Sequence, residues 1–180
     1  MLYLQHVKTT NDILPEYLNT PIGELLEYHN LSKPFKTLSK PQLLVGMCMD
    51  YRKNLRIPEK FAFIMRTGGA NFQGKEFNIA FAIGVKHIKY FVIIGHDHCG
   101  MSNIGEHRND FIEGMIQQAG WTKETATEYF DKEVGNFDIG DEAKFTLKEV
   151  NRLKELYPGI VIAPLFYLVS DNSLSQIIES

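Results

Sequence analysis

Four short apolar runs interrupt the polar chain and predict the core of a sheet. Each run is continuous rather than alternating, which is typical of strands buried on both faces of a parallel sheet. The runs are Leu43–Met47, Phe61–Met65, Phe91–Ile94 and Ile160–Ala163. They predict a single α/β domain with a central, mostly parallel sheet of four strands.

Helices are expected between and beside these runs. The apolar residues between Lys75 and Lys86 are dense enough for a helix packed on the sheet. Asp141 is placed to cap a long helix that leads into the fourth run. Residues 102–140 predict two more helices, with Thr122 capping the second and a loop at Gly135 and Gly140 before the long helix.

The two ends of the chain complete the expected architecture. Leu165–Val169, a turn at Asp171–Asn172 and Leu174–Ile178 predict a strand that leads into an edge strand. Residues 1–40 are polar with scattered apolar anchors, and Thr20–Pro21 is a suitable start for a helix ending near residue 30. We therefore expect an N-terminal helical arm over residues 1–40 and a globular domain over residues 41–180.

Composition narrows the class of ligand. The 180 residues are 44% apolar and 23% charged, as in one globular domain, and the net charge of −3 offers no basic field for nucleic acid. A small-molecule substrate or a protein partner is the better expectation. The chain contains neither a secretory leader pattern nor a run of about 18 apolar residues, so we expect no membrane contact and a cytoplasmic location.

The two cysteines both lie among residues that can bind metal. One is in Cys48-Met49-Asp50-Tyr51-Arg52 and the other in His96-Asp97-His98-Cys99. Each cluster follows an apolar run, at the strand ends where open α/β sheets bind ligands. Thiolate and imidazole together suit Zn²⁺, so Cys48, His96 and Cys99 are candidate ligands, with a fourth position open for water or Asp50.

At these residues the chain resembles the β-class carbonic anhydrases. That family carries Cys-x-Asp-x-Arg after one core strand and Gly-His-x-x-Cys-Gly after a later one, as residues 48–52 and 95–100 do here. The segment Arg66–Asn71 is similar to a third family motif, and the resemblance covers about residues 39–101. It implies reversible hydration of carbon dioxide to bicarbonate by zinc-bound hydroxide.

The resemblance also implies a role for each matching residue. Cys48, His96 and Cys99 would bind Zn²⁺, and Asp50 and Arg52 would form the family's catalytic dyad. When Arg52 holds Asp50, the carboxylate can accept a proton from water at the metal. When the pair separates, Asp50 can take the fourth position on zinc and close the site.

The expected substrate pocket departs from the family in three places. Phe63 matches a pocket aromatic, and Gly68 and Gly69 would let the backbone approach the site. Three polar family residues are replaced: the substrate-binding glutamine falls on Ser39, a glutamate on Ala80 and a pocket tyrosine on Phe81. These losses leave zinc binding intact and put efficient hydration in question.

Other readings of the same residues stay open. Asp50 could be a permanent fourth ligand of a non-catalytic zinc protein, or the enzyme could hydrolyse a carbon dioxide analogue such as carbonyl sulfide or carbon disulfide. A redox pair lacks the close spacing of Cys-x-x-Cys. We interpret His98 and His107 as polar surface and Trp121 as packing, while Arg66 could contact the substrate or hold a carboxylate.

The resemblance further implies assembly. β-class enzymes pair their protomers, with an N-terminal arm that crosses to the neighbour and pocket walls shared at the interface. Residues 1–40 suit that use, so a homodimer or a multiple of it is expected.

Overall fold

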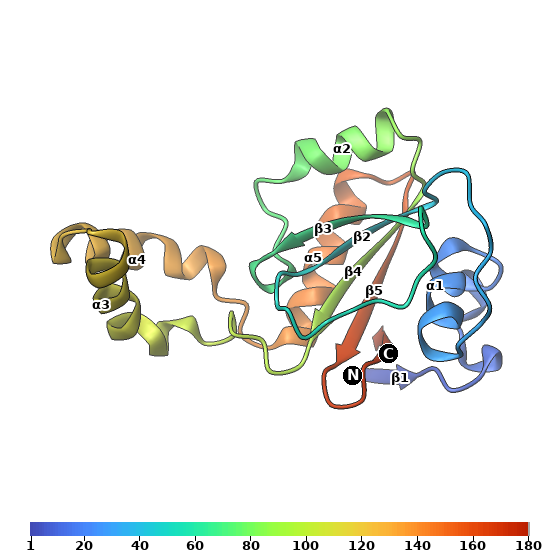
Figure 1. The fold of residues 1–180 in the computed structure, drawn as a ribbon, viewed down its shortest axis with the longest axis horizontal. Coiled ribbons are helices and arrows are strands. Elements are labelled where there is room, and N and C mark those ends of the chain that lie inside the picture. The colour runs from blue at the N-terminus through green and yellow to red at the C-terminus, as the bar shows by residue number, and fades with distance from the viewer. Residues whose placement is uncertain (180) are drawn as a thin grey trace.

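A computed structural model describes residues 1–179 of the chain, and its centre is a six-stranded sheet (Figure 1). The strands are β1 (Leu2–His6), β2 (Leu43–Cys48), β3 (Ala62–Thr67), β4 (Tyr90–His96), β5 (Val161–Leu168) and β6 (Ser173–Glu179). The α-helices are α1 (Pro21–Asn30), α2 (Glu76–Gly84), α3 (Arg108–Ala119), α4 (Lys123–Phe137) and α5 (Glu142–Leu156). The predicted α/β class is confirmed.

The strands are ordered β1-β6-β5-β4-β2-β3. β3, β2, β4 and β5 run parallel, as expected from the apolar runs, whereas β6 and β1 pair antiparallel. The prediction that residues 174–178 form an edge strand is wrong, because β1 pairs along β6 and takes the edge. The fourth run and residues 165–168 are one strand that continues through Pro164, where β5 has only β4 beside it.

The order of strands reverses between β2 and β4. From β2 the chain moves to β3 on one side, and α2 then carries it back past β2 to β4 on the other side. The two strands are parallel neighbours, with Met47 opposite Ile94. Their carboxyl ends therefore lie side by side at a switch point, which is the usual place for a ligand in this class of fold.

Helices cover both faces of the sheet (Figure 1). On one face, α1 buries Leu25, Leu26 and Tyr28 against Val45 and Val92. Each such side chain stabilises the fold by about 1.5–3 kcal/mol. The segment predicted as an arm thus packs on the sheet of its own chain. The opposite face is covered by α2 and α5, whose buried contacts are Ile79, Ala82, Val150 and Leu153.

The predicted helix starts are present. Thr20 accepts hydrogen bonds from the amides of residues 22 and 23, Thr122 from that of residue 125, and Asp141 from that of residue 144. The loop predicted at Gly135 is wrong in part, because α4 continues to Phe137. α3 and α4 form a hairpin that projects from the sheet (Figure 1). No helix within residues 1–179 combines the length and the apolar composition needed to cross a membrane.

Candidate metal centre

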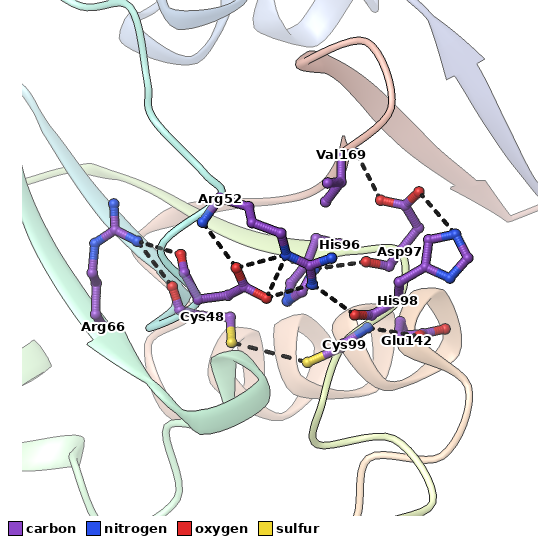
Figure 2. Close-up of polar contacts among 10 residues, drawn as sticks. Cys48, Arg52, Arg66, His96, Asp97, His98, Cys99, Glu142 and Val169 are labelled. Atoms are coloured by element: carbon purple, nitrogen blue, oxygen red, sulfur yellow. Dashed lines mark hydrogen bonds and ion pairs between the residues drawn. The ribbon is translucent and has the colours of Figure 1, made fainter.

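Two adjacent strands and the turn after one of them form the centre. Cys48 is the last residue of β2, and His96 is the last residue of β4. His98, which has a left-handed backbone with φ 53°, turns the chain so that Cys99 faces back toward the strand ends (Figure 2). The predicted convergence of Cys48, His96 and Cys99 is therefore what the fold produces.

The three side chains have the spacing of ligands to one ion. Their ligand atoms all lie within 4.8 Å of one another, and the two sulfur atoms are 3.9 Å apart. Two thiolates on a tetrahedral zinc with Zn–S bonds of about 2.3 Å would be roughly 3.8 Å apart. The side chains are only 4%, 1% and 6% exposed for Cys48, His96 and Cys99. Both cysteines are free thiols, so no disulfide competes with a metal.

The imidazole of His96 is oriented for metal binding. Its Nδ1 donates a hydrogen bond to the carbonyl oxygen of Asp97 over 2.8 Å, which leaves the lone pair on Nε2. Nε2 is buried and has no hydrogen-bond partner among the described residues. A buried acceptor without a partner is costly, and a metal ion satisfies it. The donor set of two thiols and one imidazole fits such an ion.

The thiols differ in their proton affinity. A hydrogen bond from Cys99 lowers the pKa of Cys48 to about 3, against its burial, with smaller contributions from the backbone amides of Asp50 and Gly69. The same bond to Cys48 raises the pKa of Cys99. One proton is thus shared by the two sulfurs. A metal would displace it, because both sulfurs bind as thiolates.

Asp50 is held by Arg52 beside the three ligands. The Arg52 side chain donates to both carboxylate oxygens, with its shortest bond at 2.6 Å, and the Arg52 amide adds another at 2.9 Å. These bonds hold the pKa of Asp50 well below its usual range. Arg52 also donates to the carbonyl of His98 (Figure 2), so the dyad is tied to the turn that carries Cys99. In this arrangement the carboxylate is committed to Arg52.

Arg66 fixes the loop that carries the dyad. Its guanidinium donates to the carbonyl oxygens of Cys48 and Lys53, each over 3.1 Å. Within residues 1–179, Arg66 therefore has neither a carboxylate partner nor a place among the candidate ligands. It closes the loop from residue 48 to residue 53 onto the end of β3.

Glycines let the backbone close around the centre. Gly69 has φ 63°, and a Cβ atom there would lie 2.7 Å from Ile139. Its amide can consequently donate to the sulfur of Cys48. Gly68 lies against Met101, two residues after Cys99. The expectation that these two glycines bring backbone close to the site agrees with their placement.

The other predicted pocket residues lie elsewhere in this chain. Phe63 is opposite Leu44, four residues and about 13 Å before the end of β2. Phe81 is half-exposed on α2 beside Lys86, at the end of β4 opposite to His96. Ser39 is exposed ahead of β2, and Ala80 is on α2. Their assignment to the pocket stays a prediction.

The residues interpreted as polar surface or as packing have those environments in the structure. His98 is exposed, with its ring toward Asp97 (Figure 2). His107 is exposed near Asp110. Trp121 packs its ring edge against Tyr129 at 5.3 Å between centroids.

Two residues of the centre went unnoticed in the sequence. Glu142, at the start of α5, accepts a hydrogen bond from the amide of Cys99. Lys53 is fully buried in the loop after the dyad. A lysine in a polar loop gives no sign in the sequence that the fold buries it.

The fold and the Cys-His-Cys cluster define a class: the chain has the fold of the β-class carbonic anhydrases, and the resemblance seen in the sequence is confirmed at that level. A scan against protein-family models finds no match, and no curated protein matches the sequence. The similarity is therefore carried by structure.

Three solved structures illustrate it. A β-carbonic anhydrase, isoform I, from Trichomonas vaginalis is 16% identical with a TM-score of 0.63, over 93% of this chain and 99% of that one. A carbonic anhydrase from Glaciozyma antarctica is 17% identical with a TM-score of 0.62, over 77% and 84%. The apo form of a carbon disulfide hydrolase is 20% identical with a TM-score of 0.56, over 91% of both chains.

Proposed function

We propose that the protein is a zinc enzyme that interconverts carbon dioxide and bicarbonate. The observation that carries the proposal is the buried cluster of Cys48, His96 and Cys99 with the paired Asp50 and Arg52 beside it. A fully structural zinc site has four protein ligands, whereas a catalytic site has three and an open position. Here Asp50, the carboxylate predicted as a possible fourth ligand, is engaged by Arg52, which favours the open kind.

The residues of the chain have distinct tasks in this proposal. Zinc in such a site supplies Lewis acidity and can lower the pKa of its water to about 7. Asp50, ionised and fixed by Arg52, accepts the proton of a water molecule that approaches carbon dioxide. Arg52 binds both carboxylate oxygens and so keeps the carboxylate off the open position. The low exposure of the cluster limits competing bulk water.

An apolar cavity of about 540 Å³ lies between α3 and α4, and neither the three candidate ligands nor Asp50 and Arg52 line it. It begins at Gly100 and Met101, directly after Cys99, and continues between α3 and α4 past Phe111 and Phe130. Such a lining suits an uncharged molecule such as carbon dioxide. It suits carbon disulfide or carbonyl sulfide equally, and the fold is shared with a carbon disulfide hydrolase. Hydrolysis of these analogues is therefore the second candidate.

Stopped-flow hydration of carbon dioxide between pH 7 and pH 9 tests the first candidate. Zinc-replete protein should exceed the buffer rate, and Asp50→Asn, which keeps the shape but not the charge, should retain one zinc per chain and lose the rate. Asp131→Asn, which neutralises another arginine-paired carboxylate, is the matched control on α4 and should change nothing. Zinc-replete protein at the buffer rate throughout would contradict the proposal and leave a non-catalytic zinc protein. Sulfide release from carbon disulfide would identify the second candidate.

We also propose a homodimer. α2 presents Phe77, Phe81 and Val85 at four-residue steps along one face, 80%, 48% and 53% exposed. Such a stripe supports contact with a second copy, and it includes the predicted pocket residue Phe81. Phe77→Asp should halve the mass in sedimentation, whereas a change of the exposed Leu156 to Asp at the end of α5 should not. A monomer mass for the wild type at every concentration would contradict the dimer.

The cytoplasmic location stays a prediction, supported by the two free thiols.

A further inference from the structure

A lysine without a hydrogen-bond partner is buried beside the metal centre. Lys53 is 0% exposed, and its Nζ has no hydrogen-bond partner among the described residues. Burial of an unpaired ammonium is among the most costly arrangements in a protein interior. A hydrophobic side chain of similar length would fill the same space without that cost, so the charge itself needs an explanation.

The position of Lys53 links it to the ligands. Arg66 donates to the carbonyl oxygens of both Cys48 and Lys53. The loop therefore holds the lysine near the carboxyl end of β2, which carries the first candidate ligand. Burial lowers the pKa of Lys53, and the negative charges that oppose this effect belong to Cys48, Asp50 and Cys99. The counter-charge of the lysine thus lies in the metal centre.

Other orphaned polar atoms surround the same centre. The described residues contain five buried side-chain atoms that lack a partner. Besides Lys53, three are in segments of the centre: Nε2 of His96, the hydroxyl of Thr67 opposite Cys48, and the hydroxyl of Ser102, whose amide binds the carbonyl of Cys99. The centre therefore contains buried nitrogen and oxygen atoms that are free to bind a ligand.

Counting charges shows which kind of ligand fits. A divalent ion and two thiolates cancel, and Asp50 cancels Arg52. Glu142 is only partly buried and is bonded to the amide of Cys99, and it is not among the charges that act most strongly on Lys53. Arg66 is exposed and bonded to carbonyl oxygens, so solvent screens it. Lys53 remains as one buried positive charge without a partner, and a small anion in the open position of the centre would balance it.

We propose that Lys53 is the buried counter-charge that makes the open position of this centre select a small anion. The inference rests on the proposed metal centre and assigns the lysine to the binding of anionic ligands such as bicarbonate. It is a positioning residue that acts through its field rather than by contact. With an effective dielectric constant of about 20, one charge changes the affinity for a monovalent anion by about tenfold or more at any separation up to about 12 Å.

Azide binding to the cobalt-substituted protein tests the proposal without measuring turnover. Cobalt(II) is loaded in place of zinc, its stoichiometry is measured, and azide is titrated by visible absorption at one fixed pH and ionic strength. Lys53→Met removes the charge and keeps the length, and Lys53→Arg restores a charge. Lys89→Met is the matched control, because Lys89 is exposed seven residues before His96, about 23 Å along β4. Lys53→Gln serves as a second neutral variant if Lys53→Met does not fold.

We expect both neutral variants at residue 53 to weaken azide binding about tenfold or more, and Lys53→Arg and Lys89→Met to stay within about twofold of the wild type. Lys53→Met should also unfold at a higher temperature, which a merely structural lysine would not do. Cobalt-loaded Lys53→Met with the azide affinity of the wild type would overturn the inference and leave the metal centre intact. A wild type that binds no cobalt would overturn both.

Discussion

Gly95, in β4, lies so close to α5 that no side chain fits there. A Cβ atom there would be 2.0 Å from the hydroxyl oxygen of Thr146 and 3.2 Å from its Cβ. The Thr146 side chain cannot change rotamer without losing a hydrogen bond, because its hydroxyl donates to the carbonyl of Glu142 over 2.7 Å. The side chain is also buried. Gly95→Ala must therefore push α5 from the sheet or break that bond.

The magnitude follows from these contacts. Overpacking of a rigid site costs about 1–3 kcal/mol, and a clash at this distance places Gly95→Ala near the upper end. Thr146→Ala alone should cost about 2 kcal/mol, for a hydrogen bond and a buried methyl group. Thr146→Ala also removes the hydroxyl oxygen that a Cβ at residue 95 would strike. The double variant should therefore be about 2 kcal/mol more stable than the sum of the two single effects predicts.

Urea unfolding of the four proteins measures this coupling. Gly114→Ala is the control, since Gly114 is inside α3 with open space around its Cα, and the change should stabilise by about 1 kcal/mol. Metal affinity should fall in Gly95→Ala and recover in the double variant, because His96 is the next residue. Strict additivity of the two changes would refute the steric reasoning.

Three further predictions concern ligands, pH and the N-terminal segment. Cys48→Ala, His96→Ala or Cys99→Ala should each abolish stoichiometric zinc in metal analysis; retained zinc would contradict the ligand assignment. Burial raises the pKa of Tyr17 from 10.0 to about 12, so its share of stability is complete below pH 10 and is lost as the pH rises to 12, by up to about 3 kcal/mol. Urea midpoints from pH 9 to pH 12 should show this loss, and Tyr17→Phe should reduce it. Removal of residues 1–30 should unfold the monomer itself by circular dichroism, because α1 is part of its core.

The sequence predicts the central strands well because burial on both faces leaves a continuous apolar run. β1 escapes this logic, since Leu2–His6 has only three apolar residues before two polar ones and is only partly buried at the sheet edge. Its partner along the sheet is more than 160 residues away. No local sequence pattern predicts a pairing between segments so far apart. For the same reason the sequence could not predict that β1 is the edge strand.

The centre was predictable for a different reason. Cysteine and histidine are recognisable in a sequence as metal-binding residue types. Here they lie at the ends of strands, and parallel neighbouring strands bring those ends together. The role of Lys53 was invisible because burial is a property of the folded chain: a lysine three residues after Asp50 reads as surface until its environment is known. The distance of Phe63 from the ligands likewise depends on strand register.

The pairing of the first and last strands has a consequence for how the protein folds. Leu2 lies opposite Glu179, so this contact closes a loop of nearly the whole chain. Contacts of such long range slow folding, because chain entropy is lost before the contact repays it. β2 and β4 are joined by fewer than 50 residues and can pair much earlier. The ligand-bearing strands should form a folding nucleus, and β1 should be the last to dock, with the lowest protection in amide exchange.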